Sequence, residues 1–98
     1  MAPAAADAVY GPYQLRNLNS GKCLVLQGGE NGTIPFQYNC ANFADQKWYT
    51  GWYDNGTTFR LMNTNNGKCL VSQGTNNGTN PFQYHCKDFA DQVWYLTY

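Results

Sequence analysis

Charge is scarce in this chain, and its scarcity excludes several kinds of partner. Charged residues make up 12% of the 98 residues, and acidic and basic side chains balance to a net charge of +0. Such a surface offers no positive field to the phosphates of a nucleic acid. The sequence also contains no apolar run long enough to form a membrane-spanning helix. We therefore expect no nucleic-acid partner and no membrane insertion.

Side chains that perform catalysis or bind metals are also few. The chain has one histidine, His85, and only two serines. Catalysis needs a positioned nucleophile, a base or a pair of carboxylates. The cysteines lack the C-x-x-C spacing that is typical of zinc sites. The sequence therefore predicts a protein that is not an enzyme and that has no metal or other cofactor.

Aromatic residues, by contrast, are abundant. They make up 16% of the chain, with 8 Tyr, 5 Phe and 3 Trp, which is too aromatic for a disordered protein. Most of the polarity comes from neutral Asn, Gln, Gly and Thr. Flat rings and neutral amides suit ligands rich in hydroxyl groups. The same rings also suit the core of a small β protein, so composition alone leaves both interpretations open.

The chain is an internal repeat with a period of 46 residues, the spacing between Cys23 and Cys69. The segment 21–25 returns as 67–71, with the sequence Gly-Lys-Cys-Leu-Val in both places. A repeat of this size marks a supersecondary unit that buries its apolar face only against copies of itself. The predicted division is an N-terminal arm at 1–12, a first repeat at 13–58 and a second repeat at 59–98.

Each repeat predicts short strands separated by turns rich in Gly and Asn. No window shows sustained helical periodicity, so the fold class is all-β. A single helical turn is compatible with 42–46 and 88–92. The strands expected in the first repeat are 13–17, 22–27, 36–40 and 47–53.

Each repeat also carries one pair of cysteines. Four cysteines permit three pairings, and the repeat symmetry favours Cys23 with Cys40 and Cys69 with Cys86. Each disulfide would close a loop of 17 positions and contribute roughly 3 kcal/mol in the chain-entropy model. Paired structural cysteines are typical of secreted proteins. The Ala-rich start lacks the features of a signal peptide and looks like the front of a mature secreted protein after an added initiator Met.

Two Gln-x-Trp motifs close the repeats, Gln46-Lys47-Trp48 and Gln92-Val93-Trp94. In register with the cysteine pairs and the Gly-Lys-Cys-Leu strands, they make residues 13–98 resemble the ricin-type B-chain lectins. That resemblance implies a fold of β-trefoil-type repeats. It also implies that each motif is structural: the Trp fills the shared core and the Gln satisfies backbone groups.

The sugar pocket of that family implies three positions in each repeat. An aromatic platform lies two residues before the second Cys, and an acidic or amide residue directly precedes the Gln-x-Trp motif. The third position, an Asp two residues after the first Cys, is occupied here by Val25 and Val71. The platform and acidic positions are matched by Tyr38 and Asp45, and by Tyr84 and Asp91.

A substitute for the missing Asp lies on the same strand. Residues two apart share a face of a strand, so Gln27 shares a face with Val25, and Gln73 shares one with Val71. Asp would accept hydrogen bonds from sugar hydroxyls, Gln would donate and accept, and Tyr would stack. The alternative is that Val25, Phe36 and Tyr38 pack together and close the pocket. The predicted sugar-binding residues are Gln27, Tyr38, Asn39 and Asp45 in the first repeat and Gln73, Tyr84, His85 and Asp91 in the second.

A β-trefoil needs three such units, and this chain has two. Association of chains, a third unit outside this sequence, or a departure from the trefoil would each resolve the deficit. Three chains hold six units, enough for two trefoils, and a swapped dimer is also open. Exposed strand edges favour assembly, so we predict an obligate homo-oligomer.

These expectations combine into one function and one alternative. The sequence predicts a secreted, non-catalytic, lectin-like protein that binds a glycan or polysaccharide and is multivalent through its repeats and its assembly. The alternative is a secreted protein-interaction module or inhibitor on a ricin-type scaffold that has lost sugar binding. The apolar residues Val25 and Phe36 favour that alternative.

Overall fold

The computed structural model describes residues 8–87 and 89–97. The expected initiator Met and most of the expected N-terminal arm therefore lie outside the described residues. The described chain is built of strands and two 3-10 turns, which confirms the all-β prediction, and none of its helices could span a membrane. The elements are β1 (Ala8–Gln14), β2 (Cys23–Val25), β3 (Phe36–Tyr38), η1 (Ala44–Gln46), β4 (Lys47–Trp52), β5 (Thr58–Asn63), β6 (Cys69–Val71), β7 (Phe82–Tyr84), η2 (Ala90–Gln92) and β8 (Trp94–Tyr95).

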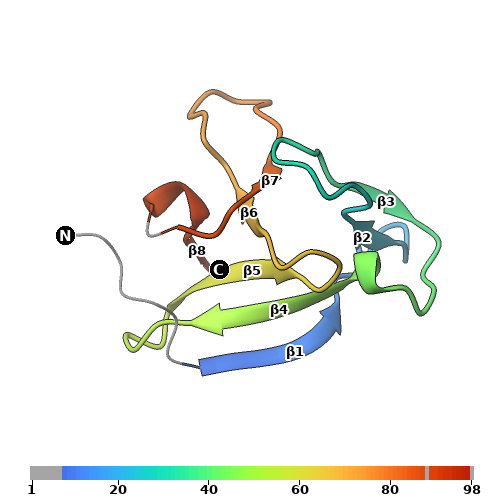
Figure 1. The fold of residues 1–98 in the computed structure, drawn as a ribbon, viewed down its shortest axis with the longest axis horizontal. Coiled ribbons are helices and arrows are strands. Elements are labelled where there is room, and N and C mark those ends of the chain that lie inside the picture. Colours follow the sequence, from blue (N-terminus) through green and yellow to red (C-terminus); the bar gives the residue numbers. More distant parts are fainter. Residues whose placement is uncertain (1–7, 88, 98) are drawn as a thin grey trace.

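Four strands form a continuous antiparallel ladder in the order β1-β4-β5-β8. Each repeat contributes its first and last strand to this ladder. Its two middle strands form a hairpin, β2-β3 in the first repeat and β6-β7 in the second (Figure 1). Within the described chain, β1 and β8 each have only one neighbour in the ladder. The ladder therefore ends in two free edges.

The first strand begins earlier than the sequence predicted. We expected it at Tyr13, but β1 already pairs with β4 from Ala8. The register shifts between Tyr10 and Tyr13, where Pro12 lacks the N–H that a regular ladder needs. This interruption masks the strand in the sequence, because the residues before it look like part of an arm.

The core lies where the two repeats meet. It consists of Leu26, Trp48 and Leu70, against which further leucines and Trp94 pack. The indole N–H of Trp48 donates to the Leu24 carbonyl at 3.1 Å, and that of Trp94 donates to the Leu70 carbonyl at 3.1 Å. Trp48 is fully buried, whereas Trp94 on the edge strand β8 is only half-buried. The two equivalent tryptophans thus differ in burial, because β8 has no further strand beside it in the described chain.

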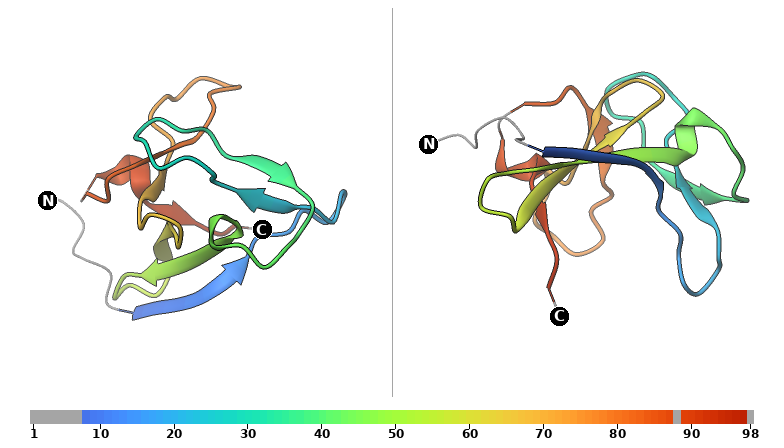
Figure 2. Two further views of the ribbon diagram at one scale, coloured as in Figure 1. Left: turned by 45° about the vertical axis from the view of Figure 1, so that its right-hand side comes forward. Right: turned by 90° about the horizontal axis from the view of Figure 1, so that it is seen from below.

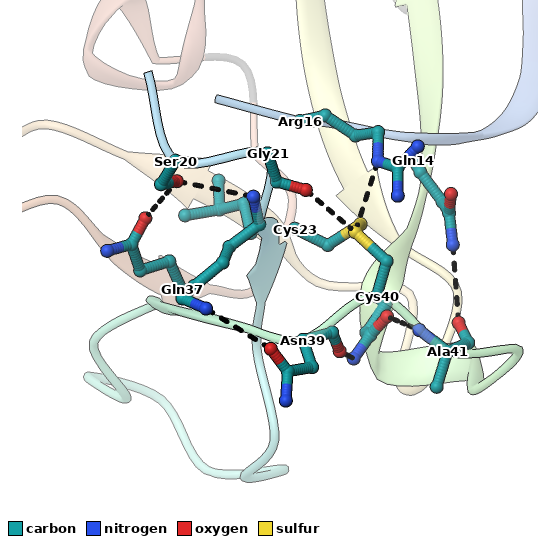
Figure 3. Close-up of a disulfide and its surroundings, with 12 residues drawn as sticks. Gln14, Arg16, Ser20, Gly21, Cys23, Gln37, Asn39, Cys40 and Ala41 are labelled. Atoms are coloured by element: carbon teal, nitrogen blue, oxygen red, sulfur yellow. Dashed lines mark hydrogen bonds between the residues drawn. A yellow bond between two sulfur atoms is a disulfide. The ribbon is translucent and has the colours of Figure 1, made fainter. Parts of the chain in front are cut away.

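The two disulfides pair as predicted, Cys23 with Cys40 and Cys69 with Cys86. Each joins the start of the second strand of its repeat to the segment just after the third. The Cα atoms lie 5.1 and 5.0 Å apart. Around the first disulfide, the Gln14 amide donates to the Ala41 carbonyl at 3.2 Å, so β1 is attached to the segment that the disulfide holds (Figure 3).

The repeats also meet through a loop. Residues 28–33, between β2 and β3, cross to the second repeat and lie against β7, as Figure 1 and the left view of Figure 2 show. The Gly32 N–H donates to the Gln83 carbonyl at 2.7 Å, and the Gln83 N–H donates to the Thr33 carbonyl at 2.9 Å. The loop between β2 and β3 therefore joins the hairpin of the first repeat to that of the second by backbone hydrogen bonds to β7.

Candidate functional site

A surface cavity lies beside the hairpin of each repeat. The cavity of the first repeat has a volume of about 400 Å³. All four residues of the predicted first site line it. Its full lining is Val25, Gln27, Phe36, Tyr38, Asn39, Ala41, Phe43, Asp45 and Gln46.

The cavity of the second repeat has a volume of about 360 Å³ and lies at the equivalent place. The structure brings Gln73, Tyr84 and Asp91 together around it. His85 is not among its lining residues; its ring centroid lies 5.9 Å from that of Tyr84. The lining is Val71, Gln73, Phe82, Tyr84, Lys87, Phe89, Asp91 and Gln92.

Strand pairing and backbone contacts place the polar residues around the first cavity. Val25 lies opposite Phe36 in the β2-β3 hairpin, and Tyr38 lies two residues further along the same face. The Leu26 N–H donates to the Asp45 carbonyl at 2.9 Å. That bond attaches the η1 turn to the end of β2 and so sets Asp45 beside Gln27.

The glutamine of each Gln-x-Trp motif supports the cavity wall. Gln46 is buried; its side-chain oxygen accepts from the Ala41 N–H at 2.7 Å, and its amide donates to the Asn39 carbonyl at 2.9 Å. Gln92 makes the equivalent pair of bonds in the second repeat, from the Lys87 N–H at 2.8 Å and to the His85 carbonyl at 2.8 Å. Each glutamine thus holds in place the backbone on both sides of the second cysteine of its repeat, directly after the platform tyrosine.

The acidic residue of each cavity has an unusual hydrogen-bonding state. Asp45 and Asp91 are half-buried, and the Oδ1 atom of each is buried without a hydrogen-bond partner among the described residues. A buried carboxylate oxygen normally has a donor, because losing water without replacement costs free energy. The hydroxyl group of a ligand is one donor that fits such an acceptor.

Aromatic rings are open to solvent beside these acids. Tyr38 is 62% exposed and Phe36 is 43% exposed, so the rings do not close the first cavity by packing together. Phe43 and Phe89, exposed by 64% and 56%, line the two cavities and were not among the predicted residues. Their signal in the sequence was the repeated Phe-Ala-Asp-Gln segment, in which only the acid was considered as a ligand.

Together, the four strands of each repeat, the paired hairpins and the Gln-x-Trp motifs packed at the core define a β-trefoil-type, lectin-like domain. Models of the ricin-type beta-trefoil lectin domain-like family match residues 5–84 and 44–98. The chain belongs to that family. No curated protein sequence matched the chain.

Among solved structures, the chain is similar to a designed 3-fold symmetric protein, ThreeFoil. The TM-score is 0.78 at 23% sequence identity, and the alignment covers 96% of this chain and 67% of the designed one. At this identity the likeness shows the fold alone. It confirms trefoil-type repeats, and the coverage corresponds to two of three symmetric units.

Lectin-like and trefoil domains of this kind are typically not enzymes. Over residues 8–87 and 89–97, no three His, Cys, Asp or Glu side chains gather as metal ligands would. The groups that the two cavities offer to a ligand are a carboxylate acceptor, a neutral amide and exposed rings.

Proposed function

We propose that the protein binds carbohydrate, without catalysis, through the two equivalent cavities. One observation carries the proposal: in both repeats the cavity is lined by an exposed tyrosine and by an Asp whose Oδ1 is buried and has no hydrogen-bond partner among the described residues. A sugar ring has the complementary groups, because its hydroxyls donate hydrogen bonds and its C–H face packs on an aromatic ring. The lectin-like family supports the same class of ligand.

Each cavity residue has a role in this proposal. Asp45 accepts hydrogen bonds from a pair of hydroxyls, Gln27 and Asn39 donate and accept, and Tyr38 stacks on the sugar face. Gln73, Tyr84 and Asp91 act in the same way in the second repeat. Val25 occupies the usual place of an acid and supplies an apolar floor, so Gln27 takes over the second polar contact.

The setting of this activity is also part of the proposal. The two disulfides are compatible with a secreted protein in an oxidising environment. The free edges of β1 and β8 support a homo-oligomer that completes the trefoil. An assembly that presents several weak sugar sites at once gains avidity without any new contact at a single site.

The proposal predicts that removal of the two platform rings abolishes glycan binding. The oxidised protein and the double variant Tyr38→Ala/Tyr84→Ala are compared on a broad glycan and polysaccharide array. Sugar-competable binding is expected only for the unaltered protein. Leu18→Ala is the control, because Leu18 is fully exposed and lines neither cavity. Equal binding by the tyrosine double variant would refute these sites.

A second candidate function is recognition of a protein by the same scaffold. It is favoured by the apolar lining of the cavities, where Val25 and Phe36 stand beside the polar residues. Free sugar discriminates the two candidates. A ligand that free sugar displaces is bound as a glycan, whereas a protein ligand that free sugar leaves in place supports the interaction module.

A further inference from the structure

The contact between loop 28–33 and the second repeat is centred on one glutamine, Gln83. Gln83 is fully buried, and its side-chain amide donates to the carbonyls of Gly28 at 2.6 Å and Glu30 at 2.8 Å. Its backbone exchanges hydrogen bonds with Gly32 and Thr33 of the same loop. One residue of the second repeat thus holds the loop 28–33 of the first by both its side chain and its backbone.

The turn before β6 completes the surface that receives the loop. Asn66 donates to the Gly28 carbonyl at 3.0 Å and to the side-chain oxygen of Gln83 at 2.9 Å. The Lys68 ammonium donates to the Gly29 carbonyl at 2.5 Å. We call Asn66, Lys68 and Gln83 the socket of the second repeat.

The first repeat has an equivalent socket, with Ser20 in place of Asn66, and no loop of the described chain forms hydrogen bonds with it as loop 28–33 does with Gln83. Its residues are Ser20, Lys22 and Gln37, which stand one period earlier in the sequence. Ser20 donates to the side-chain oxygen of Gln37 at 2.8 Å, just as Asn66 does to Gln83. Gln37 is exposed, and its amide nitrogen has no hydrogen bond within residues 8–87 and 89–97. The socket is formed and its donor is available.

The second repeat has an equivalent loop, with Thr75 and Asn76 in place of Gly29 and Glu30, and this loop forms no hydrogen bond to another segment of the described chain. In loop 74–79, Thr79 donates to the Asn76 carbonyl through its N–H at 3.2 Å and its hydroxyl at 2.8 Å. Thr33 makes these bonds to Glu30 at 3.3 and 2.8 Å in the docked loop. The glycine between them is also alike, with φ of +86° at 78 and +93° at 32. A loop that already holds its docked shape loses little conformational freedom on binding.

We propose that loop 74–79 of one copy of this chain docks in the Gln37 socket of another copy, by the contacts that join the repeats within the chain. The inference deepens the proposed assembly and is independent of sugar binding. Docking brings the free edge of β8 beside the β1 edge of the other copy. It thereby covers exposed apolar residues on both edges, Tyr95 and Leu96 on one and Tyr13 on the other.

The space left in the incomplete trefoil determines how a second copy can dock on it. A ring of three units already containing two has room for only one more, and the chain spans 67% of the designed three-fold protein. The second copy therefore supplies its first repeat alone. Its second repeat separates from its first by a change of conformation in the turn 54–57, which joins β4 to β5. That second repeat then completes the three-unit ring of a third copy. Three chains then complete two rings.

Sedimentation combined with amide hydrogen exchange tests this docking. The intact, oxidised protein is expected to sediment with three times its 11.0 kDa chain mass. In that assembly the amides of Gly78 and Gln37 are expected to be as protected as those of Gly32 and Gln83. An assembly in which Gly78 and Gln37 exchange freely overturns the docking but leaves the proposed assembly standing. A monomer at every concentration overturns both, and glycan binding is scored separately on the same samples.

The twin glutamines supply a matched pair of variants. Gln37→Ala removes the donor of the empty socket and is expected to raise the concentration for half-assembly by about tenfold, with the fold unchanged by circular dichroism. Gln83→Ala removes the donor inside the chain and is expected to lower the Tm instead. Equal assembly of Gln37→Ala and the unaltered protein would contradict the proposal.

Discussion

At the scale of single residues, identical local sequence gives opposite environments. Gln37 and Gln83 both follow Pro-Phe and precede Tyr, yet one is exposed and the other fully buried. The difference comes from the neighbouring repeat, because only the second repeat receives a loop. Trp48 and Trp94 differ in the opposite direction, with the first-repeat residue buried, and again the difference comes from a neighbour, which the second repeat lacks here.

The buried Gln46 offers a prediction at this scale. Gln46→Ala leaves the Ala41 N–H and the Asn39 carbonyl without their protein partners at a part-buried position. We expect a loss of about 1–3 kcal/mol in the free energy of unfolding, measured by urea denaturation. Gln14→Ala is the control, because Gln14 is exposed and makes one long bond. Similar losses for the two variants would show that Gln46 is not structural.

At the scale of elements, the sequence predicted most of each repeat. The turns rich in Gly and Asn predicted the strands, and the repeat symmetry predicted the disulfides. The segments 42–46 and 88–92 were compatible with a helical turn, and the structure has η1 and η2 there. The start of β1 was missed, because Pro12 interrupts its ladder. The docking of loop 28–33 on β7 was also missed, since it depends on contacts between segments far apart in sequence. Seven of the eight predicted sugar-binding residues line the two cavities, and His85 does not.

The disulfides give a prediction for the elements. The double variant Cys23→Ala/Cys40→Ala opens a loop of 17 residues and is expected to lose roughly 3 kcal/mol of unfolding free energy. Cys69→Ala/Cys86→Ala opens a loop of equal length and serves as the matched comparison. Chemical denaturation of both variants measures the losses. An unchanged free energy of unfolding in Cys23→Ala/Cys40→Ala would contradict a stabilising role of the first disulfide, which joins the start of β2 to the segment after β3.

At the scale of the whole molecule, the two repeats form an incomplete trefoil. The ladder β1-β4-β5-β8 ends in two free edges, and apolar side chains remain exposed along both. A small domain with half-buried core residues gains stability from any neighbour that covers them. The same incompleteness accounts for the half-burial of Trp94 beside a fully buried Trp48.

Assembly is therefore expected to change the fluorescence of Trp94. As the edge of β8 becomes covered, its indole leaves water, so the emission of the protein shifts to shorter wavelength with rising concentration. Trp94→Phe is expected to abolish the shift, because Trp48 is buried in either state and Trp52 lies on β4, which already has a neighbouring strand on each side. An emission maximum that stays constant while sedimentation shows assembly would place the contact elsewhere on the molecule.

The free loop and the empty socket have a further consequence for the size of the assembly. In the terms of polymer chemistry, the two repeats make a bifunctional monomer, with one free loop and one empty socket among the described residues. Such a monomer neither branches nor terminates by itself, so growth ends only when a ring closes. The turn 54–57 is the element that permits closure, since it lets one chain serve two rings. Stiffening that turn would therefore block docking, because a rigid second copy would place its second repeat where the first repeat of the other chain already lies.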